Sequence, residues 1–213
     1  MMICGVDEAG KGSVLGPMVV AAVGCESMDD LSKLGVADSK KLSRKKRSEL
    51  DRKIRKEYTV SIVILTPEDI DRLRQEMTMN EIVAHAHAQA LDKLSCEIAY
   101  LDACDVNAER YAQTVGSLIH SECKIIAKHK ADEIYPVVSA ASIVAKVERD
   151  RKIEELSGVY GNIGSGYPSD KVTINYLNNY IQDNERAPSI ARSSWETVRQ
   201  LICCKDQSSL SDF

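Results

Sequence analysis

The sequence lacks the features that would place the chain in a membrane or in a disulfide-linked scaffold. No apolar run reaches the roughly 18 residues of a membrane span, and no basic stretch followed by an apolar one opens the chain. The seven cysteines are odd in number and form no C-x-x-C pair, which predicts reduced, mostly buried thiols. Repeats and low-complexity tracts are absent as well. These absences lead us to expect a cytoplasmic protein.

What is present is a chain of 213 residues, 44% of them hydrophobic, enough for one sizeable core with a small appendage. Its net charge of −4 conceals a basic segment, residues 38–56, with ten Lys or Arg and three Asp or Glu. Such a patch on an acidic protein suits contacts with phosphates. An amphipathic helix with a solvated face is the simpler explanation of the charge alone, because Leu42, Leu50 and Ile54 supply an apolar stripe.

The stretch GVDEAGKGS, residues 5–13, differs by one residue from a phosphate-binding P-loop, G-x-x-x-x-G-K-[ST]. Gly12 stands where a P-loop has the Ser or Thr that binds magnesium. Asp7 and Glu8 lie inside the loop, where their charge would repel phosphate. A P-loop also opens a helix, whereas Pro17 and the β-branched run after it predict a strand. We therefore expect a strand, a tight glycine turn and a second strand, with two acids ending the first strand.

Hydrophobic periodicity predicts a mixed α/β fold. After the first hairpin, strands are expected at residues 58–65, 97–103 and 124–129, and helices at 43–57, 66–74, 78–94, 106–122, 136–156, 169–182 and 193–203. Two helix starts are marked by Thr66 with Pro67 at the first helical position, and by Thr78 with Glu81 three residues later. In the parallel part of such a sheet, functional groups lie at the carboxyl ends of the strands.

Asp7, Asp102 and Asp132 lie at or just beyond such strand ends. Asp102 ends an apolar strand that has no need of an acid, whereas Asp105 has a simpler role as the N-cap of a helix beginning at the next residue. Asp132 and its neighbour Glu133 could serve only to favour the positive end of the following helix. We therefore prefer Asp102 as a functional residue and expect Asp105 to be structural.

Asp7 and Glu8 are adjacent, so on a regular strand their side chains point to opposite faces and converge only if the chain bends at the glycine turn. Two carboxylates about 4 Å apart repel by about 4 kcal/mol at an effective dielectric of about 20. A cluster of acids therefore requires a cation, and oxygen ligands select Mg²⁺ or Mn²⁺, a pair of which supports phosphodiester hydrolysis. His85 and His87 lie on different helix faces, so both are expected to be structural.

Five blocks of the sequence resemble type 2 ribonuclease H (ribonuclease HII) in its archaeal form. They are GVDEAGKGSVLGPMVVAA, DSKKLS, YLDACDVNAERY, HKADEIYPVVSAASIVAKVERD and GSGYPSD. The resemblance is collinear from residue 5 to residue 195, nearly the whole chain. It implies an RNase H-like core, a five-stranded mixed sheet flanked by helices, over residues 1–158. A C-terminal helical segment, residues 159–204, would help to grip the duplex.

The same resemblance implies an endoribonuclease that hydrolyses the RNA strand of RNA–DNA hybrids. It also implies cutting 5′ to single ribonucleotides in duplex DNA, which leaves 3′-hydroxyl and 5′-phosphate ends. The family's four acids, which bind two divalent ions, Mg²⁺ or Mn²⁺, fall on Asp7, Glu8, Asp102 and Asp132. Nothing in the sequence demands more than a monomer.

The family's ribonucleotide sensor falls on Gly10, Lys11, Gly12 and Tyr167. Backbone groups of a glycine turn can approach a 2′-hydroxyl closely, and this hydroxyl distinguishes the sugar of RNA from that of DNA. Lys11 replaces the more common Arg, which keeps the charge but loses the bidentate fork. Further substrate contacts implied by the resemblance are Lys40, Lys41, Ser139, Ser142, Lys146 and Arg149.

The last residues, 205–213, are expected to form a flexible tail. Within it, QSSLSDF fits the pattern Q-x-x-hydrophobic-x-x-aromatic and resembles the sliding-clamp-binding peptide of archaeal and eukaryotic replication proteins. Gln207 would fill a polar pocket of the clamp, and Leu210 and Phe213 an apolar one. A polar tail without a partner is the alternative.

Two other functions stay open on the sequence. A junction resolvase with an RNase H fold would use similar acids but be indifferent to the type of sugar. A non-catalytic clamp-associated nucleic-acid-binding protein has no use for clustered acids near phosphate, so the four acids argue against it.

Overall fold

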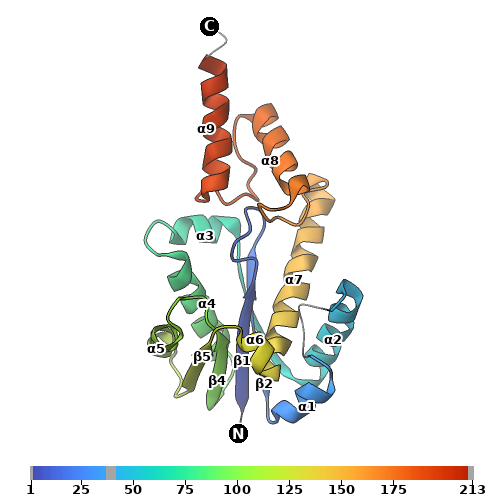
Figure 1. Ribbon diagram of the computed structural model, residues 1–213, viewed down its shortest axis with the longest axis vertical. Helices are drawn as coiled ribbons and strands as arrows, with labels where there is room; N and C mark the ends of the chain where they lie inside the picture. The colour runs from blue at the N-terminus through green and yellow to red at the C-terminus, as the bar shows by residue number, and fades with distance from the viewer. Residues whose placement is uncertain (1, 37–41, 211–213) are drawn as a thin grey trace. The chain divides into compact units, whose positions relative to one another are not determined.

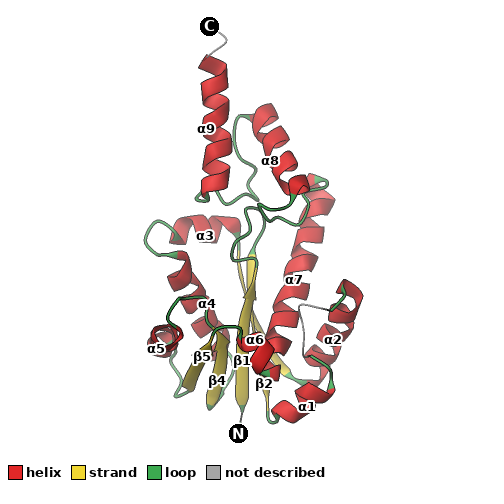
Figure 2. Cartoon of the chain, in the orientation of Figure 1, coloured by secondary structure: helices red, strands yellow, loops and turns green. Residues whose placement is uncertain are grey.

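The computed structural model describes residues 2–36 and 42–210, with residues 204–210 described as backbone only. The strands are β1 (Ile3–Ala9), β2 (Met18–Cys25), β3 (Thr59–Leu65), β4 (Ile98–Asp102) and β5 (Lys124–Lys128). They form one sheet in the order β3-β2-β1-β4-β5. In it β1 is antiparallel to β2 and parallel to β4, and β4 is parallel to β5. The expected five-stranded mixed sheet flanked by helices is confirmed (Figure 2).

The helices of the described residues are α1 (Met28–Lys33), α2 (Arg44–Glu57), α3 (Pro67–Leu73), α4 (Met79–Asp92), α5 (Ala108–Leu118), α6 (Ala131–Ile134), α7 (Pro136–Tyr160), α8 (Lys171–Asn184) and α9 (Glu196–Leu210). Sequence periodicity missed α1 and α6 because helices of six and four residues are too short to show it. Among these helices, none is long and apolar enough to cross a membrane.

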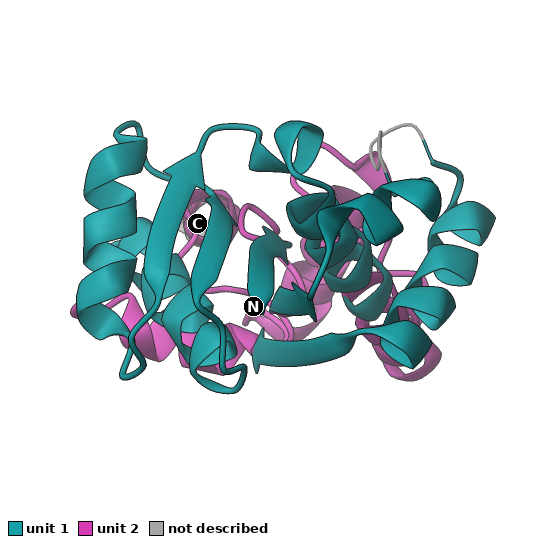
Figure 3. Cartoon of the chain, turned by 90° about the horizontal axis from the view of Figure 1, so that it is seen from below, with its two compact units in different colours: residues 1–9, 19–64, 78–148 teal, residues 10–18, 65–77, 149–213 magenta. Residues whose placement is uncertain are grey.

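The chain divides into two compact units that are interleaved in sequence (Figure 3). Residues 1–9, 19–64 and 78–148 form the first, which we call the sheet unit. Residues 10–18, 65–77 and the chain from 149 onward form the second, the helical unit. This division differs from the expected boundary at residue 158. The last boundary between the two units falls between residues 148 and 149, inside α7, and residues 10–18 and 65–77 belong to the same unit as the C-terminal helices.

The core of the sheet unit encloses β2, whose sequence MVVAAVGC is buried at every position. Helices α1, α2 and the first half of α7 pack on one face of the sheet, while α4 and α5 pack beside β1 and β5 on the other (Figure 1). Gly5 permits the close approach of α7 to β1. A Cβ atom at this position would lie 2.4 Å from the carbonyl carbon of Val137. A strand covered on both faces reads as a continuous apolar run, as β2 does.

The helical unit has a core of its own, in which the glycine-turn segment packs with the C-terminal helices. Its buried members are Val14, Leu15, Ile153, Ile163, Leu177, Ile190, Ala191 and Val198. Leu15 forms an isolated antiparallel bridge with Ala191, so a segment near the start of the chain pairs with one near its end. This bridge joins residues that no local sequence pattern connects.

Several predicted helix starts are confirmed. Thr66 and Thr78 each accept a hydrogen bond from the backbone N–H three residues later, and both helices carry a complete capping box. The expected role of Asp105 was wrong. Helix α5 begins at Ala108 with Asn107 as its N-cap, and Asp105 instead accepts hydrogen bonds from the backbone N–H of Asn107 and the side chain of Arg110.

The C-terminal helix is longer than the sequence interpretation allowed. We expected it to end at residue 203 and a flexible tail to follow, but α9 continues to Leu210. No glycine or proline between Glu196 and Leu210 interrupts the helical backbone, which gives the physical reason for the extension.

Candidate active site

The end of β1 carries Asp7 and Glu8. The strand pairs with β2 in continuous register through its last residue, so Asp7 and Glu8 leave opposite faces of the strand at its end, where the charge of Glu8 still acts on Asp7. The two acids accordingly take partners on helices that cover opposite faces of the sheet. Asp7 is hydrogen-bonded to Ser142 of α7, while Oε2 of Glu8 lies 3.1 Å from Nε2 of His87 in α4. The backbone N–H of Glu8 also donates to Oδ1 of Asp7 at 2.7 Å.

The ionisation of Asp7 is strongly perturbed by its surroundings. Its side chain is buried, and burial followed by the negative charge of Glu8 raises its pKa well above the usual range. The charge of Asp102 adds to this rise, whereas the hydrogen bonds from Ser142 and from the backbone of Glu8 oppose it. Three acids from β1 and β4 therefore act on one another electrostatically at the carboxyl end of two parallel strands.

Asp102 and Asp132 are connected through the start of α6. Oδ1 of Asp102 accepts a hydrogen bond of 2.7 Å from the backbone N–H of Ala131, so the end of β4 caps this short helix. Lys130, the residue before the helix, has a positive φ of 54° and offers no side-chain cap of its own. Asp132 follows Ala131 directly and is buried. The fourth acid is thus placed one residue from the group that Asp102 binds.

The four acids have the chemistry of divalent-cation ligands, although their side chains are not yet arranged around one common metal position. The described residues hold no group of three or more His, Cys, Asp or Glu side chains set to bind one metal ion. The donors at the strand ends are all carboxylate oxygens, the ligands that Mg²⁺ and Mn²⁺ prefer. Burial raises the pKa of Asp7 first, and the negative charges of Glu8 and Asp102 raise it further; a bound cation would offset that part of the rise which comes from the two charges.

Helix α7 holds the predicted contact residues Ser139, Ser142 and Lys146. Nζ of Lys146 donates to Oγ of Ser142 at 2.7 Å, and Ser142 is the hydrogen-bond partner of Asp7. Ser142 therefore connects the ammonium group of Lys146 to the carboxyl group of Asp7. Ser139 is buried and donates to the backbone carbonyl of Val36. Of the three, Lys146 alone is partly exposed.

In the helical unit, the glycine turn is held from within. Gly10 has a φ of +85°, which suits glycine, and a Cβ atom there would lie 2.5 Å from Nε of Arg149. Arg192 donates to the carbonyl groups of Gly10 and Lys11 at 2.7 Å and 2.9 Å. Lys11 is partly exposed and Gly12 is exposed. The rim of the turn is therefore accessible while its base is fixed.

The predicted sensor residue Tyr167 belongs to the same unit as the turn. The guanidinium of Arg149 lies over its ring, 4.4 Å from the centroid, and Nη2 of Arg149 donates to the carbonyl of Ser165 at 2.8 Å. Arg149 is buried between this contact and Gly10. The structure therefore brings the glycine turn and Tyr167 together around one arginine, which explains why Arg149 is not an exposed polar contact.

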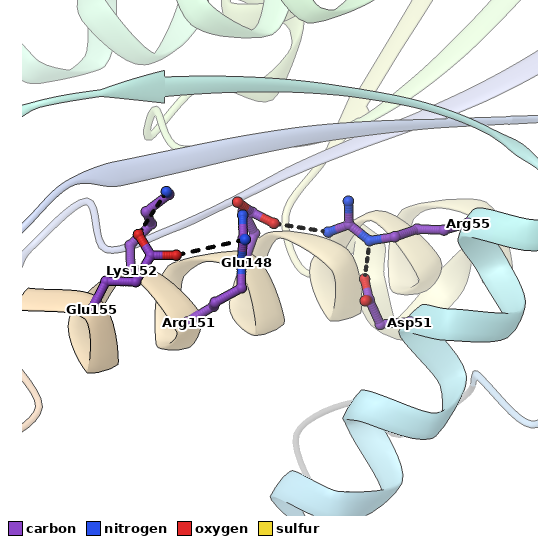
Figure 4. A network of polar contacts seen from close by, with 6 residues as sticks. All are labelled: Asp51, Arg55, Glu148, Arg151, Lys152 and Glu155. Atoms are coloured by element: carbon purple, nitrogen blue, oxygen red, sulfur yellow. Dashed lines mark hydrogen bonds and ion pairs between the residues drawn. The ribbon is translucent and has the colours of Figure 1, made fainter. Parts of the chain in front are cut away.

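From Arg44 onward the basic segment lies in the amphipathic α2, with Leu50 and Ile54 buried, as its apolar stripe predicts. Not all of its cations face solvent. Arg55 lies between two acids, with Nε 2.8 Å from Asp51 and Nη2 3.1 Å from Glu148 of α7 (Figure 4). Lys40 and Lys41 lie outside the described residues, as does Phe213. Gln207 and Leu210 lie in α9, where the structure describes backbone only.

Sequence reasoning missed the roles of His87, Tyr111 and Arg192. His87 was expected to be structural, but the sequence did not indicate its partners, which are Glu8 on one side and the hydroxyl of Tyr111, at 3.0 Å, on the other. The available signal was a histidine on the alanine-rich buried face of α4. Arg192 bonds to a backbone 182 residues away, at Gly10, and no local pattern announces such a contact.

Comparisons with known proteins agree on one family. A sequence profile described as Ribonuclease HII matches residues 4–198. A protein of that name from Methanospirillum hungatei JF-1 is 66% identical over 212 residues, and the match covers the whole of both chains.

Two solved structures are similar over nearly their full length. One is that of the PCNA:RNase HII complex from Archaeoglobus fulgidus, with a TM-score of 0.88 and 45% identity, covering 92% of this chain and 96% of that one. The other is ribonuclease H2 from Pyrococcus horikoshii OT3, with a TM-score of 0.89 and 39% identity, covering 95% and 97%. The chain belongs to the ribonuclease HII family, metal-dependent nucleases that cleave the RNA of RNA–DNA hybrids.

Proposed function

We propose that this chain cuts 5′ to single ribonucleotides in duplex DNA as well as within RNA–DNA hybrids, leaving 3′-hydroxyl and 5′-phosphate ends. We further propose that Asp7, Glu8, Asp102 and Asp132 hold two divalent cations, Mg²⁺ or Mn²⁺. The observation that carries this proposal is the buried carboxyl of Asp7 at the end of β1, whose pKa is raised first by burial and then by the charges of Glu8 and Asp102. Bound divalent cations supply an activated water and stabilise the charge that develops on a phosphodiester.

The chain's own residues would keep the ligands in place. Ser142 holds the carboxyl of Asp7 and is itself held by Lys146. Asp102 is fixed by the backbone of Ala131. Carboxylates tied by such hydrogen bonds keep one orientation, which lowers the cost of assembling a cation site around them. In this proposal the four acids act as ligands and not as proton donors.

Recognition of the ribonucleotide is proposed for the glycine turn and Tyr167. Gly12 is exposed, and Lys11 is partly so, at the rim of a turn that Arg149 and Arg192 support from below. Backbone groups of such a turn can hydrogen-bond to a 2′-hydroxyl, the group that DNA lacks. One residue separates Glu8 from Gly10 in the sequence, so chain connectivity alone keeps the Cα atoms of these two residues within about 7 Å of one another.

The proposal is tested with an RNA–DNA hybrid labelled at the end of its RNA strand, incubated with Mg²⁺, Mn²⁺ or a chelator. We expect Asp7→Asn and Asp102→Asn to lower the cleavage rate by at least about 100-fold, the usual effect of removing one charge-stabilising group. Glu133→Gln is the matched control, because Glu133 is an exposed acid next to Asp132. Equal rates for Asp7→Asn and the control would contradict the proposed role of the acids.

A sliding clamp is proposed as a protein partner of the C-terminal segment. The support is the pattern QSSLSDF at residues 207–213, together with the similar Archaeoglobus fulgidus protein whose structure is that of a PCNA:RNase HII complex. Deleting residues 207–213 should leave cleavage of a short duplex unchanged and abolish binding to the clamp in a pull-down. Undiminished clamp affinity of the double variant Leu210→Ala, Phe213→Ala would contradict this assignment.

A further inference from the structure

Two buried side chains beyond the four acids are linked in series to Glu8. His87 of α4 is fully buried, and its Nε2 lies 3.1 Å from Oε2 of Glu8. On the other side of the ring, Nδ1 lies 3.0 Å from the hydroxyl of Tyr111 in α5, which is 2% exposed. The side chain of Glu8 keeps 12% of its surface exposed. Of the three hydrogen-bonded side chains, Tyr111 and His87 are buried inside the sheet unit and Glu8 is partly accessible to solvent.

The hydrogen-bonding capacity of the groups fixes the direction of this series. An ionised carboxylate accepts hydrogen bonds and donates none, so Nε2 of His87 carries the proton that Glu8 receives. A neutral imidazole protonated at Nε2 has a lone pair at Nδ1, which can accept the proton of the Tyr111 hydroxyl, a group that is also hydrogen-bonded to the side chain of Cys104. One tautomer of His87 thus satisfies all three groups, with Tyr111 selecting that tautomer from behind.

Packing alone does not account for these residues. His87 lies on a face of α4 whose other buried residues are Ile, Val, Leu and Ala, where an apolar side chain would fill the space without a polar atom to satisfy. Its ring meets that of Tyr111 edge to face, with centroids 5.8 Å apart and an interplanar angle of 81°. This geometry directs the phenolic oxygen to the ring nitrogen rather than stacking the rings.

We propose that His87 and Tyr111 are positioning residues that hold the Glu8 carboxylate in one orientation and thereby strengthen its binding of a divalent cation. The inference rests on the proposed function in one respect, that Glu8 is a cation ligand. With Oε2 held by His87, the carboxylate keeps Oε1 and its remaining lone pairs in a fixed direction, instead of sampling the rotamers of a free glutamate. Hydrogen-bond partners behind a ligand contribute about 10- to 100-fold in metal affinity.

The experiment measures Mn²⁺ affinity of the full chain by isothermal titration calorimetry, without substrate. We expect His87→Leu to weaken binding by about 10- to 100-fold and Tyr111→Phe by about tenfold. His87→Gln places an amide N–H near the position of Nε2 but has no equivalent of Nδ1, so it should retain most of the affinity. In the His87→Gln background, Tyr111→Phe should then have no further effect.

The matched control is Tyr160→Phe, which deletes a hydroxyl bonded to Oγ of Ser189 within the helical unit, whereas Glu8 belongs to the sheet unit. It should leave Mn²⁺ affinity unchanged. An independent readout is the ¹⁵N chemical shifts of His87 in metal-free protein, which are expected to show a neutral ring protonated at Nε2. Circular dichroism melting shows whether each variant is folded. If His87→Leu does not fold, the test rests on comparing the effect of Tyr111→Phe in wild-type protein with its effect in His87→Gln protein.

Unchanged Mn²⁺ affinity in Tyr111→Phe would overturn the proposed positioning of Glu8 by His87 and Tyr111. So would an equal loss of affinity caused by Tyr111→Phe in the wild-type background and in the His87→Gln background. So would a His87 ring protonated at Nδ1, because its lone pair would then face the carboxylate. Failure of the proposed function looks different. Wild-type protein would then bind no Mn²⁺, or Asp7→Asn would cleave normally. The tautomer of His87 in metal-free protein would still decide whether Tyr111, His87 and Glu8 are hydrogen-bonded in series.

Discussion

Arg192 is the side chain on which the conformation of the glycine turn depends most. It is fully buried, and its guanidinium donates to the carbonyl groups of Gly10 at 2.7 Å, Lys11 at 2.9 Å and Gly16 at 3.1 Å. Burial lowers the pKa of Arg192 to about 9, so the group remains positive at neutral pH. Replacing it with methionine, Arg192→Met, keeps a long apolar side chain and removes the donor from all three carbonyl groups.

The size of the effect follows from two opposing contributions. A hydrogen bond from a charged donor contributes about 1.5–3 kcal/mol, so three carbonyl acceptors together correspond to about 4.5–9 kcal/mol. Desolvation of a buried charge, which Arg192→Met relieves, costs several kcal/mol. We therefore expect a net loss of about 3 kcal/mol in the free energy of unfolding. For a chain of this size that corresponds to a decrease of about 6–12 °C in melting temperature.

The assay uses a probe that the sequence provides. Trp195 is the chain's one tryptophan, and the guanidinium of Arg192 lies 4.9 Å from its ring centroid, so fluorescence reports unfolding at this place. The control is Arg199→Met, because Arg199 is exposed on α9 and its replacement should change stability by less than about 0.5 kcal/mol. A loss in Arg192→Met no larger than in the control would refute the view that Arg192 supports the turn.

Three further predictions concern single residues. Gly10→Ala should destabilise the chain by more than about 1 kcal/mol, because φ is +85° and the new Cβ atom would meet Arg149. Gly12→Ala, with open space around the new Cβ atom, should leave the stability unchanged. Equal denaturation midpoints of the two variants would contradict this. Hydrogen bonds, first from the backbone of Ser165, lower the pKa of Asp170, so its contribution to stability is present above its ordinary pKa and is lost as the pH falls through the lowered value. The urea midpoint reported by Trp195 should therefore fall with pH below about 4, and less steeply in Asp170→Asn. Thr78→Ala should cost about 1 kcal/mol by removing the capping box of α4, measurable as a lower melting temperature by circular dichroism, and an unchanged value would argue against the cap.

Local sequence patterns predicted the elements whose causes are local. The N-cap Thr66 with Pro67 after it, and the capping box of Thr78 with Glu81, depend on residues at most three apart, and the strands depend on short apolar runs, so these features were visible in the sequence. Asp102 was predicted as functional because an apolar strand has no need of a terminal acid, and the structure places it within electrostatic reach of Asp7. Asp105 was misassigned because two candidate caps, Asp105 and Asn107, lie two residues apart and propensity does not separate them.

Features that depend on distant contacts were out of reach. The spacing of His85 and His87 correctly separates them on the helix, with His85 exposed and His87 buried, but it says nothing of what His87 meets on β1. The burial of Arg192 and the bridge between Leu15 and Ala191 join opposite ends of the chain. Such contacts follow from the packing of whole elements, which local periodicity does not encode.

The measurement that most directly tests the central claim is cleavage of an end-labelled DNA duplex containing one ribonucleotide, beside an all-DNA duplex of the same sequence. Wild-type protein and Asp7→Asn would be compared in Mg²⁺, in Mn²⁺ and in chelator. We predict a single cut 5′ to the ribonucleotide that requires a divalent cation, is absent from the all-DNA duplex and is lost in Asp7→Asn. Cutting of both duplexes alike, or a cut that survives in Asp7→Asn, would contradict the account.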